Sequence, residues 1–219
     1  FTAAEFNYAQ AACAVSISGL EMLQNSGKEA IIDLLESRIQ NAEKTLVNNI
    51  AADCYSDGTA DGGKQIGGLQ LLVDNTPSTG TVGGIDASTT LGSFWRNIAV
   101  DSGVATASTI QASMNQTALQ LVRGTDKTDL IIADSNYYGL YLASLQAIQR
   151  ITSEEMAGSG FTSLKYFGHG GAADVVLDGG YGGACPTNTM FFLNTDYIFF
   201  RPHADRNFVP IGDDRFATN

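Results

Sequence analysis

The sequence has few of the residues on which many scaffolds and sites depend. Among 219 residues there are 3 cysteines and 2 histidines, and Cys13, Cys54 and Cys185 are widely spaced with no CxxC pair. Such a set argues against a disulfide framework and a four-cysteine zinc site, and fits a reducing cytoplasm. His169 and His203 lack the further close ligands that a zinc site needs, so we predict no metal and no other cofactor.

Charge is sparse and one-sided. Lys and Arg number 12 against 23 Asp and Glu, which gives a formal net charge of -11 and a pI near 4.4. An acidic chain without a run of Lys or Arg is repelled by phosphate backbones, so a dedicated nucleic-acid-binding domain is not expected. Hydrophobic residues make up 44% of the chain. This is enough for a packed core and too much for a disordered polyelectrolyte.

Long apolar runs and a leader pattern are missing as well. No stretch approaches the roughly 18 consecutive apolar residues that span a bilayer, so no membrane span is predicted. Residues 1–7 carry neither the charged nor the apolar region of a signal peptide. The chain begins with Phe1 and ends with Asn219 without a terminating pattern, which leads us to expect a piece of a longer protein.

The strongest pattern that is present predicts one long helix. Between Glu29 and about Tyr55 there is no Pro or Gly, and apolar residues recur at steps of three and four. Capping boxes at 18–21 and 26–29 predict a short helix and then the start of the long one. A helix of this length with one apolar stripe is expected to pack on a sheet or on other helices along its whole length. The stripe consists of Ile32, Leu35, Ile39, Ala42, Leu46 and Ile50.

The rest of the chain mixes strand and helix patterns. Phe94 and Trp95 are expected to form an aromatic anchor, and Asp134 is expected to cap a helix. Because the patterns do not alternate strictly, the predicted fold class is α+β rather than a doubly wound sheet. Strands are predicted at 5–18, 69–73, 130–133, 164–167, 173–177, 190–193 and 197–200, and helices at 108–122 and 136–151.

Patterns that could carry catalysis are incomplete. The Gly-rich stretches 61–64 and 178–183 match neither phosphate-loop pattern, and Gly158-Ser159-Gly160 is too short for a nucleophile elbow. The adjacent acids Glu154 and Glu155 point in different directions on a helix. Asp residues at 53, 57 and 61 have the wrong spacing for a calcium loop. We therefore do not predict an enzyme.

The C-terminal stretch 201–216 interleaves opposite charges with aromatic and aliphatic residues. Arginine and aromatic residues are favoured at protein interfaces. We predict a subunit interface here that uses Arg201, Arg206, Phe208 and Arg215. The alternative is a loop with incidental ion pairs, which contribute little when they are exposed.

Several stretches together carry a resemblance to a known family. They are SISGLEMLQNSGKE at 16–29, the long helix at 31–55, DGGKQIGGL at 61–69, FWRN at 94–97, LVRGTDK at 121–127, DVVLDGG at 174–180 and FLNTDY at 192–197. As an ensemble, and over nearly the whole chain, they closely resemble the major capsid proteins of tailed bacteriophages and prophages that have the Hong Kong phage-type coat fold.

The resemblance implies an organisation for the chain. Residues 1–18 would be the return strand of the extended loop, and 19–103 the peripheral domain with a spine helix at about 28–56. Residues 104–200 would form a mixed α/β axial domain, and 201–219 would lead back toward the peripheral domain. The family's N-terminal arm, most of its extended loop and its last strand are not among these residues, so no cross-linking lysine can be assigned.

The resemblance also implies a function. The protein would be a structural subunit that self-assembles into hexamers and pentamers of an icosahedral capsid, enclosing double-stranded DNA without binding it specifically. It would be located in the virion and assembled in the cytoplasm of a bacterial host. Its partners would be copies of itself, with a scaffold, a maturation protease and a portal as further candidates.

Two alternatives from other classes stay open. The first is a small cytoplasmic hydrolase or transferase with a site in a Gly-rich loop. The second is a carbohydrate- or partner-binding module, suggested by the Thr/Ser-rich loop at 75–90 and by the tyrosines. If the capsid reading holds, the 219-residue piece is expected to stay monomeric or to form small oligomers, because the arms that link subunits would lie outside it.

Overall fold

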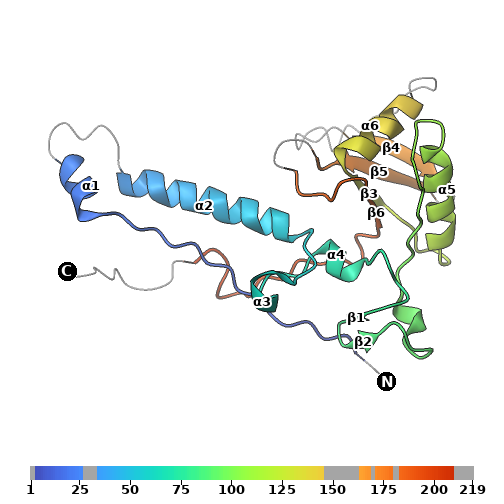
Figure 1. The fold of residues 1–219 in the computed structure, drawn as a ribbon, viewed down its shortest axis with the longest axis horizontal. Helices are drawn as coiled ribbons and strands as arrows, with labels where there is room; N and C mark the ends of the chain where they lie inside the picture. The colour runs from blue at the N-terminus through green and yellow to red at the C-terminus, as the bar shows by residue number, and fades with distance from the viewer. Residues whose placement is uncertain (1–2, 27–33, 146–162, 169–170, 180–182, 210–219) are drawn as a thin grey trace.

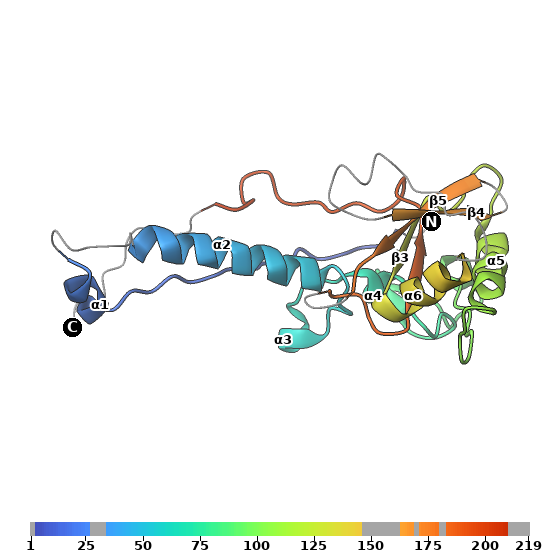
Figure 2. The ribbon, with the colours of Figure 1, turned by 90° about the horizontal axis from the view of Figure 1, so that it is seen from above.

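The computed structural model describes residues 3–26, 34–145, 163–168, 171–179 and 183–209. Helices and strands are mixed in this part of the chain, which confirms the α+β class. A sheet with its covering helices lies at one end of the molecule, and a long helix projects from it together with two extended segments (Figure 1; Figure 2). No helix of the described residues is long and apolar enough to cross a membrane.

Four strands form the main sheet. Their spatial order is β4 (Ser163–Gly168), β5 (Gly171–Leu177), β3 (Leu130–Ala133) and β6 (Met190–Leu193). β5 pairs antiparallel with β4 and parallel with β3, whereas β6 pairs antiparallel with β3. The strands predicted at 130–133, 164–167, 173–177 and 190–193 are thereby confirmed.

One face of the sheet packs on α5 (Ile110–Leu121) and α6 (Ser135–Ser144), as Figure 1 shows. Met114 on α5, Ile131 on β3 and Val175 on β5 are the largest fully enclosed side chains. The helix predicted at 108–122 is confirmed, and the one predicted at 136–151 is confirmed as far as Ser144. This cluster holds Ile110, Met114, Ala118, Ile131, Ala133, Tyr138, Tyr141, Leu164, Tyr166, Ala173 and Val175.

The opposite face of the sheet carries a second, smaller cluster. Leu69, Phe191 and Leu193 are buried there, and Leu130 and Ile132 of β3 pack beside them. Since Ile131 and Ala133 face the helices, β3 is in contact with apolar groups on both faces, which its continuous apolar run predicts.

The strand predicted at 69–73 is wrong. Leu69 begins a single helical turn, α4 (Leu69–Leu72), and its amide donates to the carbonyl of Cys54 at 2.7 Å. A Cβ on Gly68 would lie 2.3 Å from that carbonyl oxygen, so the close contact requires glycine. The chain therefore coils against the end of the long helix instead of joining the sheet.

The long helix, α2 (Leu34–Asp53), is unbroken over its described length. The part predicted at 28–33 lies outside the described residues. The packing prediction is wrong, because no residue of α2 is buried and Leu35 is 55% exposed. Only the end of the helix reaches the sheet, where the ring of Tyr55 lies 6.3 Å from that of Phe191. The rest of the rod projects away from the sheet (Figure 2).

Two other predicted strands are also wrong. Residues 3–18 form an extended arm without strand pairing, and residues 197–200 are likewise unpaired. Their β-type side chains favour an extended backbone, but a strand also needs a partner to form its ladder of hydrogen bonds. The loop at 75–90 instead contains a small hairpin of β1 (Thr81–Val82) and β2 (Ile85–Asp86).

Three short helical segments complete the described part: α1 (Gly19–Gln24), α3 (Ala60–Gly63) and the 3-10 turn η1 (Ser93–Trp95). The prediction that Phe94 and Trp95 in η1 anchor the chain to the core is wrong. Phe94 and Trp95 are both exposed, and they pack edge to face on each other with 6.3 Å between ring centroids.

Candidate functional site

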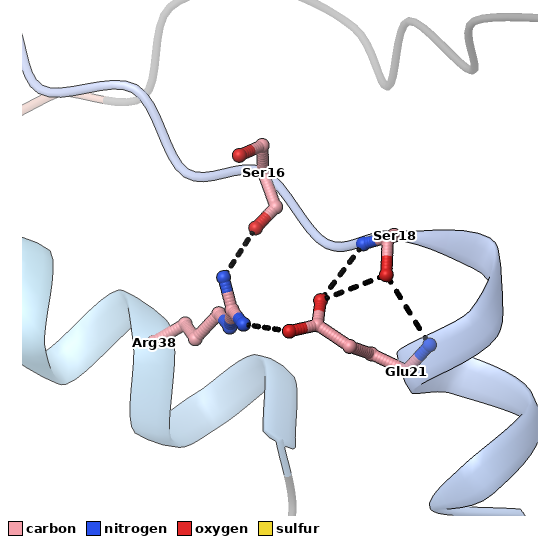
Figure 3. Close-up of polar contacts among 4 residues, drawn as sticks. All are labelled: Ser16, Ser18, Glu21 and Arg38. Atoms are coloured by element: carbon pink, nitrogen blue, oxygen red, sulfur yellow. Dashed lines mark hydrogen bonds and ion pairs between the residues drawn. The ribbon is translucent and has the colours of Figure 1, made fainter.

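The arm is joined to the long helix by a polar cluster at the start of α1. Ser18 and Glu21 form the predicted capping box, in which the Ser18 hydroxyl accepts from the Glu21 amide at 3.3 Å. The Ser18 amide donates to Glu21 Oε2 at 3.0 Å. Arg38 on α2 then donates through Nη2 to Glu21 Oε1 at 2.6 Å and through Nη1 to the Ser16 carbonyl at 2.8 Å (Figure 3).

These contacts fix the charge of Glu21. Hydrogen bonds from Ser18 and the charge of Arg38 hold the pKa of the Glu21 carboxyl below its ordinary value. The carboxylate is therefore ionised at neutral pH. It completes the capping box of α1 and accepts from Arg38 on α2. The sequence identified the box but not Arg38, because its partner lies 17 residues away and no local spacing pattern indicates it.

Two further contacts hold the arm along its length. Near its start, the Glu5 amide donates to the Gly83 carbonyl in the turn of the β1–β2 hairpin at 3.0 Å. Gly83 has φ +59, and a Cβ there would lie 2.9 Å from that of Ala4. Further on, the ring of Tyr8 meets the ring of His203 edge-on, with 6.2 Å between centroids. The arm thus touches both the hairpin and the C-terminal extended segment.

The elements that project from the sheet end expose many large apolar side chains. We call the arm 3–18, α1, α2 and the segment 197–209 the projecting surface. Where such groups form a contiguous patch, they are typical of sites of contact with another protein or a membrane. The exposed side chains here are Phe6, Tyr8, Val15, Leu20, Leu23, Leu35, Ile39, Val47, Tyr197, Ile198, Phe199, Phe200, Phe208 and Val209.

The predicted interface residues lie on this surface as far as they are described. The Arg201 guanidinium lies 5.3 Å from the centre of the Phe199 ring, a cation–π contact. The Arg206 amide donates to the His203 carbonyl at 3.2 Å and closes a turn. Phe208 is 58% exposed. Arg215 lies outside the described residues. The role of these side chains in an interface stays a prediction.

A second group of polar residues gathers where β3 and β5 end. Because these strands are parallel, Asp134 and Asp178, which follow them, come to the same edge of the sheet. Asp134 is 4% exposed and caps α6, as predicted. Its carboxylate accepts from the amides of Asn136 at 3.2 Å, Tyr137 at 3.1 Å and Asn188 at 2.9 Å. The signal in the sequence is an apolar strand followed directly by Asp, which occurs twice.

The neighbouring nucleophile candidates at this edge are protonated. Burial, and then the charges of Asp134 and Asp178, raise the pKa of the Cys185 thiol to about 12. Burial and the Asp178 carboxylate also raise the pKa of the Tyr55 hydroxyl. At neutral pH both groups therefore stay mainly protonated, which is their less nucleophilic form. The two carboxylates also oppose the binding of a phosphate group here.

The Gly-rich stretches have packing and turn roles where they are described. A Cβ on Gly179 would lie 2.3 Å from Ser135 Oγ, so the 178–183 stretch needs glycine to pass the start of α6. In α3, Asp61 and Gly62 adopt left-handed backbone angles in an exposed turn. Neither stretch forms a cradle around a shared centre in the described part.

The other sequence candidates are dispersed. Asp53 accepts from Gln65 at 2.6 Å, whereas Asp57 accepts from the amide and hydroxyl of Thr59 in a separate turn. Asp205 lies 3.9 Å from His203 Nδ1. The described residues contain no group of three His, Cys, Asp or Glu side chains that could hold a metal ion. His169, Ser159, Glu154 and Glu155 lie outside the described residues.

The chain matches no protein-family model, no curated protein and no solved structure. The resemblance to capsid proteins therefore remains a prediction, to be supported from the chain's own residues. Among the described residues, the acidic groups at the sheet edge are committed to capping and packing, and many of the exposed large apolar side chains lie on the projecting surface.

Proposed function

We propose that this chain is the structural subunit of a shell of the phage major capsid type, which associates with copies of itself into rings. The observation that carries the proposal is the projecting surface, with its apolar side chains held away from the packed sheet end. In this reading the arm 3–18 is the return strand of the extended loop and α2 is the spine helix. The sheet with α5 and α6 belongs to the axial domain.

The energetics favour covering this surface. Each apolar side chain that is removed from water on association contributes about 25 cal/mol per Å² of buried apolar area, before the costs of ordering. Leu35, Ile39 and Val47 are exposed on α2 and gain this contribution only from a partner. Neighbouring copies of one chain provide such a partner repeatedly in a closed symmetric assembly.

The joint at Ser18, Glu21 and Arg38 supports the same role. It orients the arm along α2 by hydrogen bonds and charge rather than by a large apolar contact, so the apolar side chains of both elements stay available. The net charge of -11 also suits a shell that encloses DNA without gripping it, because it opposes adhesion to phosphate.

Self-association of the 219-residue chain tests the proposal. We expect sedimentation velocity to show small oligomers whose share grows with concentration, and closed particles only from a longer chain that includes the linking arms. Leu35→Asp on α2 should shift the distribution toward monomer, since it places a charge in the stripe. Leu119→Asp on α5 is the matched control, because Leu119 is 58% exposed but lies at the sheet end. Equal effects of both variants would contradict the proposal, and so would a longer chain with the linking arms that stays monomeric under all conditions.

A further inference from the structure

The segment 197–201, which follows β6 and one turn, has the composition of a strand but no strand partner. Its sequence Tyr-Ile-Phe-Phe-Arg holds aromatic and β-branched residues, which favour strands. All five residues are exposed, and Phe199 and Phe200 are each 63% exposed. Within the described part of the chain, no hydrogen bond engages the backbone groups of residues 198–200. Such an unpaired run of donors and acceptors is a template for pairing with another chain.

A contact inside the segment shows how its side chains are arranged. The Arg201 guanidinium lies 5.3 Å from the centre of the Phe199 ring. Successive side chains of an extended backbone point to opposite faces, and those two positions apart share a face. Phe199 and Arg201 therefore lie on one face, and Ile198 and Phe200 lie on the other.

The two ends of the segment determine which backbone groups can pair. The Tyr197 amide is already used, since it donates to the Asn194 carbonyl at 3.2 Å. Pro202 has no amide N–H and cannot extend a ladder as a donor. Between these limits, the N–H and C=O groups of Ile198 and Phe200 point to the same side of the strand, because alternate residues do so. That edge is the one available for a ladder.

We propose that residues 198–200 of two copies of the chain pair as antiparallel strands around a two-fold axis, with Phe199 opposite Phe199 of the second copy. The amide of Ile198 then donates to the Phe200 carbonyl of the second copy, and the amide of Phe200 donates to its Ile198 carbonyl. The symmetry doubles these to four hydrogen bonds. Two-fold symmetry requires one residue to lie opposite itself, because each bonded pair must map onto another.

The side chains of the segment are complementary to themselves in this register. Phe199 occupies the position without hydrogen bonds, where opposite side chains come closest, and forms an aromatic pair with its counterpart. Ile198 lies opposite Phe200 on the other face. Aromatic pairs and pairs of an aromatic with a β-branched residue are favourable across strands. A second copy therefore supplies a suitable neighbour at every position of the ladder.

The charges favour the same occupant. The register places Arg201 of one copy opposite Tyr197 of the other. The Tyr197 hydroxyl donates to Asp126 Oδ2 at 3.0 Å, so an incoming guanidinium meets both an aromatic ring and a carboxylate. No two like charges lie opposite each other within 197–201, where Arg201 is the one charged residue.

The inference rests on the proposed function, since the partner is another copy of the chain. It adds a kind of contact that the proposal did not specify. A two-fold contact uses the same patch on both copies, so it cannot close a ring of more than two subunits. In a shell it would instead join one ring to the next.

A charge swap at a single position tests the pairing, because Phe199 faces itself. Phe199→Glu and Phe199→Lys should each weaken association about tenfold in sedimentation experiments, since each places two like charges opposite each other. An equal mixture of the two variants should restore most of the association through Glu–Lys pairs. Phe94→Glu is the matched control, because Phe94 is 61% exposed but lies in η1, and it should change nothing. Circular dichroism should show one fold throughout.

Cysteine cross-linking tests the register. The native thiols are first removed by Cys13→Ser, Cys54→Ser and Cys185→Ala. Phe199→Cys should then form disulfide-linked dimers on mild oxidation, because the two Cα atoms opposite each other fall within the range of about 4.4–6.8 Å that a disulfide spans. Phe200→Cys is the control and should link about tenfold more slowly, since its counterpart lies one diagonal step away.

The failures of the two proposals can be told apart. A mixture no better than its separate components, equal effects of Phe94→Glu and Phe199→Glu, or equally fast linking of both cysteine variants would overturn the strand pairing and leave the shell proposal standing. So would a wild-type 219-residue chain that stays monomeric. Dimers that show the predicted charge and cysteine patterns would support the pairing even where a longer chain forms no closed particles.

Discussion

Arg38 on α2 and Glu21 on α1 form an ion pair in which Nη2 and Oε1 lie 2.6 Å apart. The same guanidinium holds the Ser16 carbonyl, so one side chain sets both the position of α1 and the direction in which the arm leaves it. The contact is about two-fifths exposed on each side, which limits its strength but allows it to open and close.

Arg38→Ala should release the arm without unfolding the sheet end. The Ser16 carbonyl and Glu21 then lose their charged donor, while the core clusters do not involve Arg38. Hydrogen exchange followed by mass spectrometry should show faster exchange across 3–24, with an unchanged melting temperature. Lys44→Ala on the same helix is the control and should not alter the arm. Unchanged exchange in Arg38→Ala would show that the pair does not hold the arm.

Acid should loosen the same joint. The pKa of Glu21 is lowered in the folded chain, so its contribution is fully present above its ordinary value of 4.5 and is lost as pH falls through the lowered value. The Ser18 amide, followed by NMR, should therefore change below about pH 4.5 and stay constant from there to neutrality. In Glu21→Gln this acidic transition should vanish. A transition above pH 5, or one that persists in the variant, would contradict the assignment.

The two apolar faces of the molecule should respond differently to truncation. Ile131→Ala removes a fully buried side chain between β5, β6 and the helices and should cost about 2–5 kcal/mol in the free energy of unfolding. Leu35→Ala, on the exposed stripe of α2, should change it by less than about 1 kcal/mol. Urea denaturation measures both. Similar losses for the two variants would show that α2 is covered within a single chain.

Asp134 should stabilise the fold through its three amide contacts. Asp134→Ala leaves the amides of Asn136, Tyr137 and Asn188 without this acceptor and should cost about 1–3 kcal/mol. Asp134→Asn retains one acceptor oxygen and should cost less. Thermal or urea unfolding gives the comparison. Equal stability of the Ala variant and the wild type would show that the cap does not stabilise the junction between β3 and α6.

Local signals in the sequence predicted much of this fold. The spacing of serine and glutamate predicted the start of α1. An apolar run followed by Asp134 predicted both the strand β3 and the N-cap of α6. These features depend on residues within four positions of one another. The sequence could therefore specify them without any knowledge of the tertiary contacts.

Features that depend on distant partners could not be predicted in the same way. The periodicity of α2 shows that one face of the helix is apolar, but not whether that face is covered by the same chain or by another. The run at 69–73 is too short to separate a strand from a helical turn, and contact with Cys54 decided in favour of the turn. The arm has strand-type residues, but strand pairing requires a partner that lies elsewhere.

Of the candidate functional features, one could also be predicted from local sequence and one could not. The exposed segment with Arg201, Arg206 and Phe208 was visible in the sequence because charges and aromatics alternate there. The pocket that Asp57, Asp74 and Phe191 help to line was not, because the two Asp residues follow α2 and α4 and Phe191 lies more than a hundred residues further along the chain. Spacing rules do not connect such positions.

The contact between Tyr55 and Phe191 gives the long helix a mechanical property. α2 ends at Asp53, two residues before Tyr55, and Phe191 belongs to β6, the outermost strand beside β3. A sideways force on the far end of the rod would therefore reach β6, which in the described part of the chain is paired with β3 alone. Such a load would meet the rim of the sheet first, because Ile131 and Val175 lie on the inner strands β3 and β5.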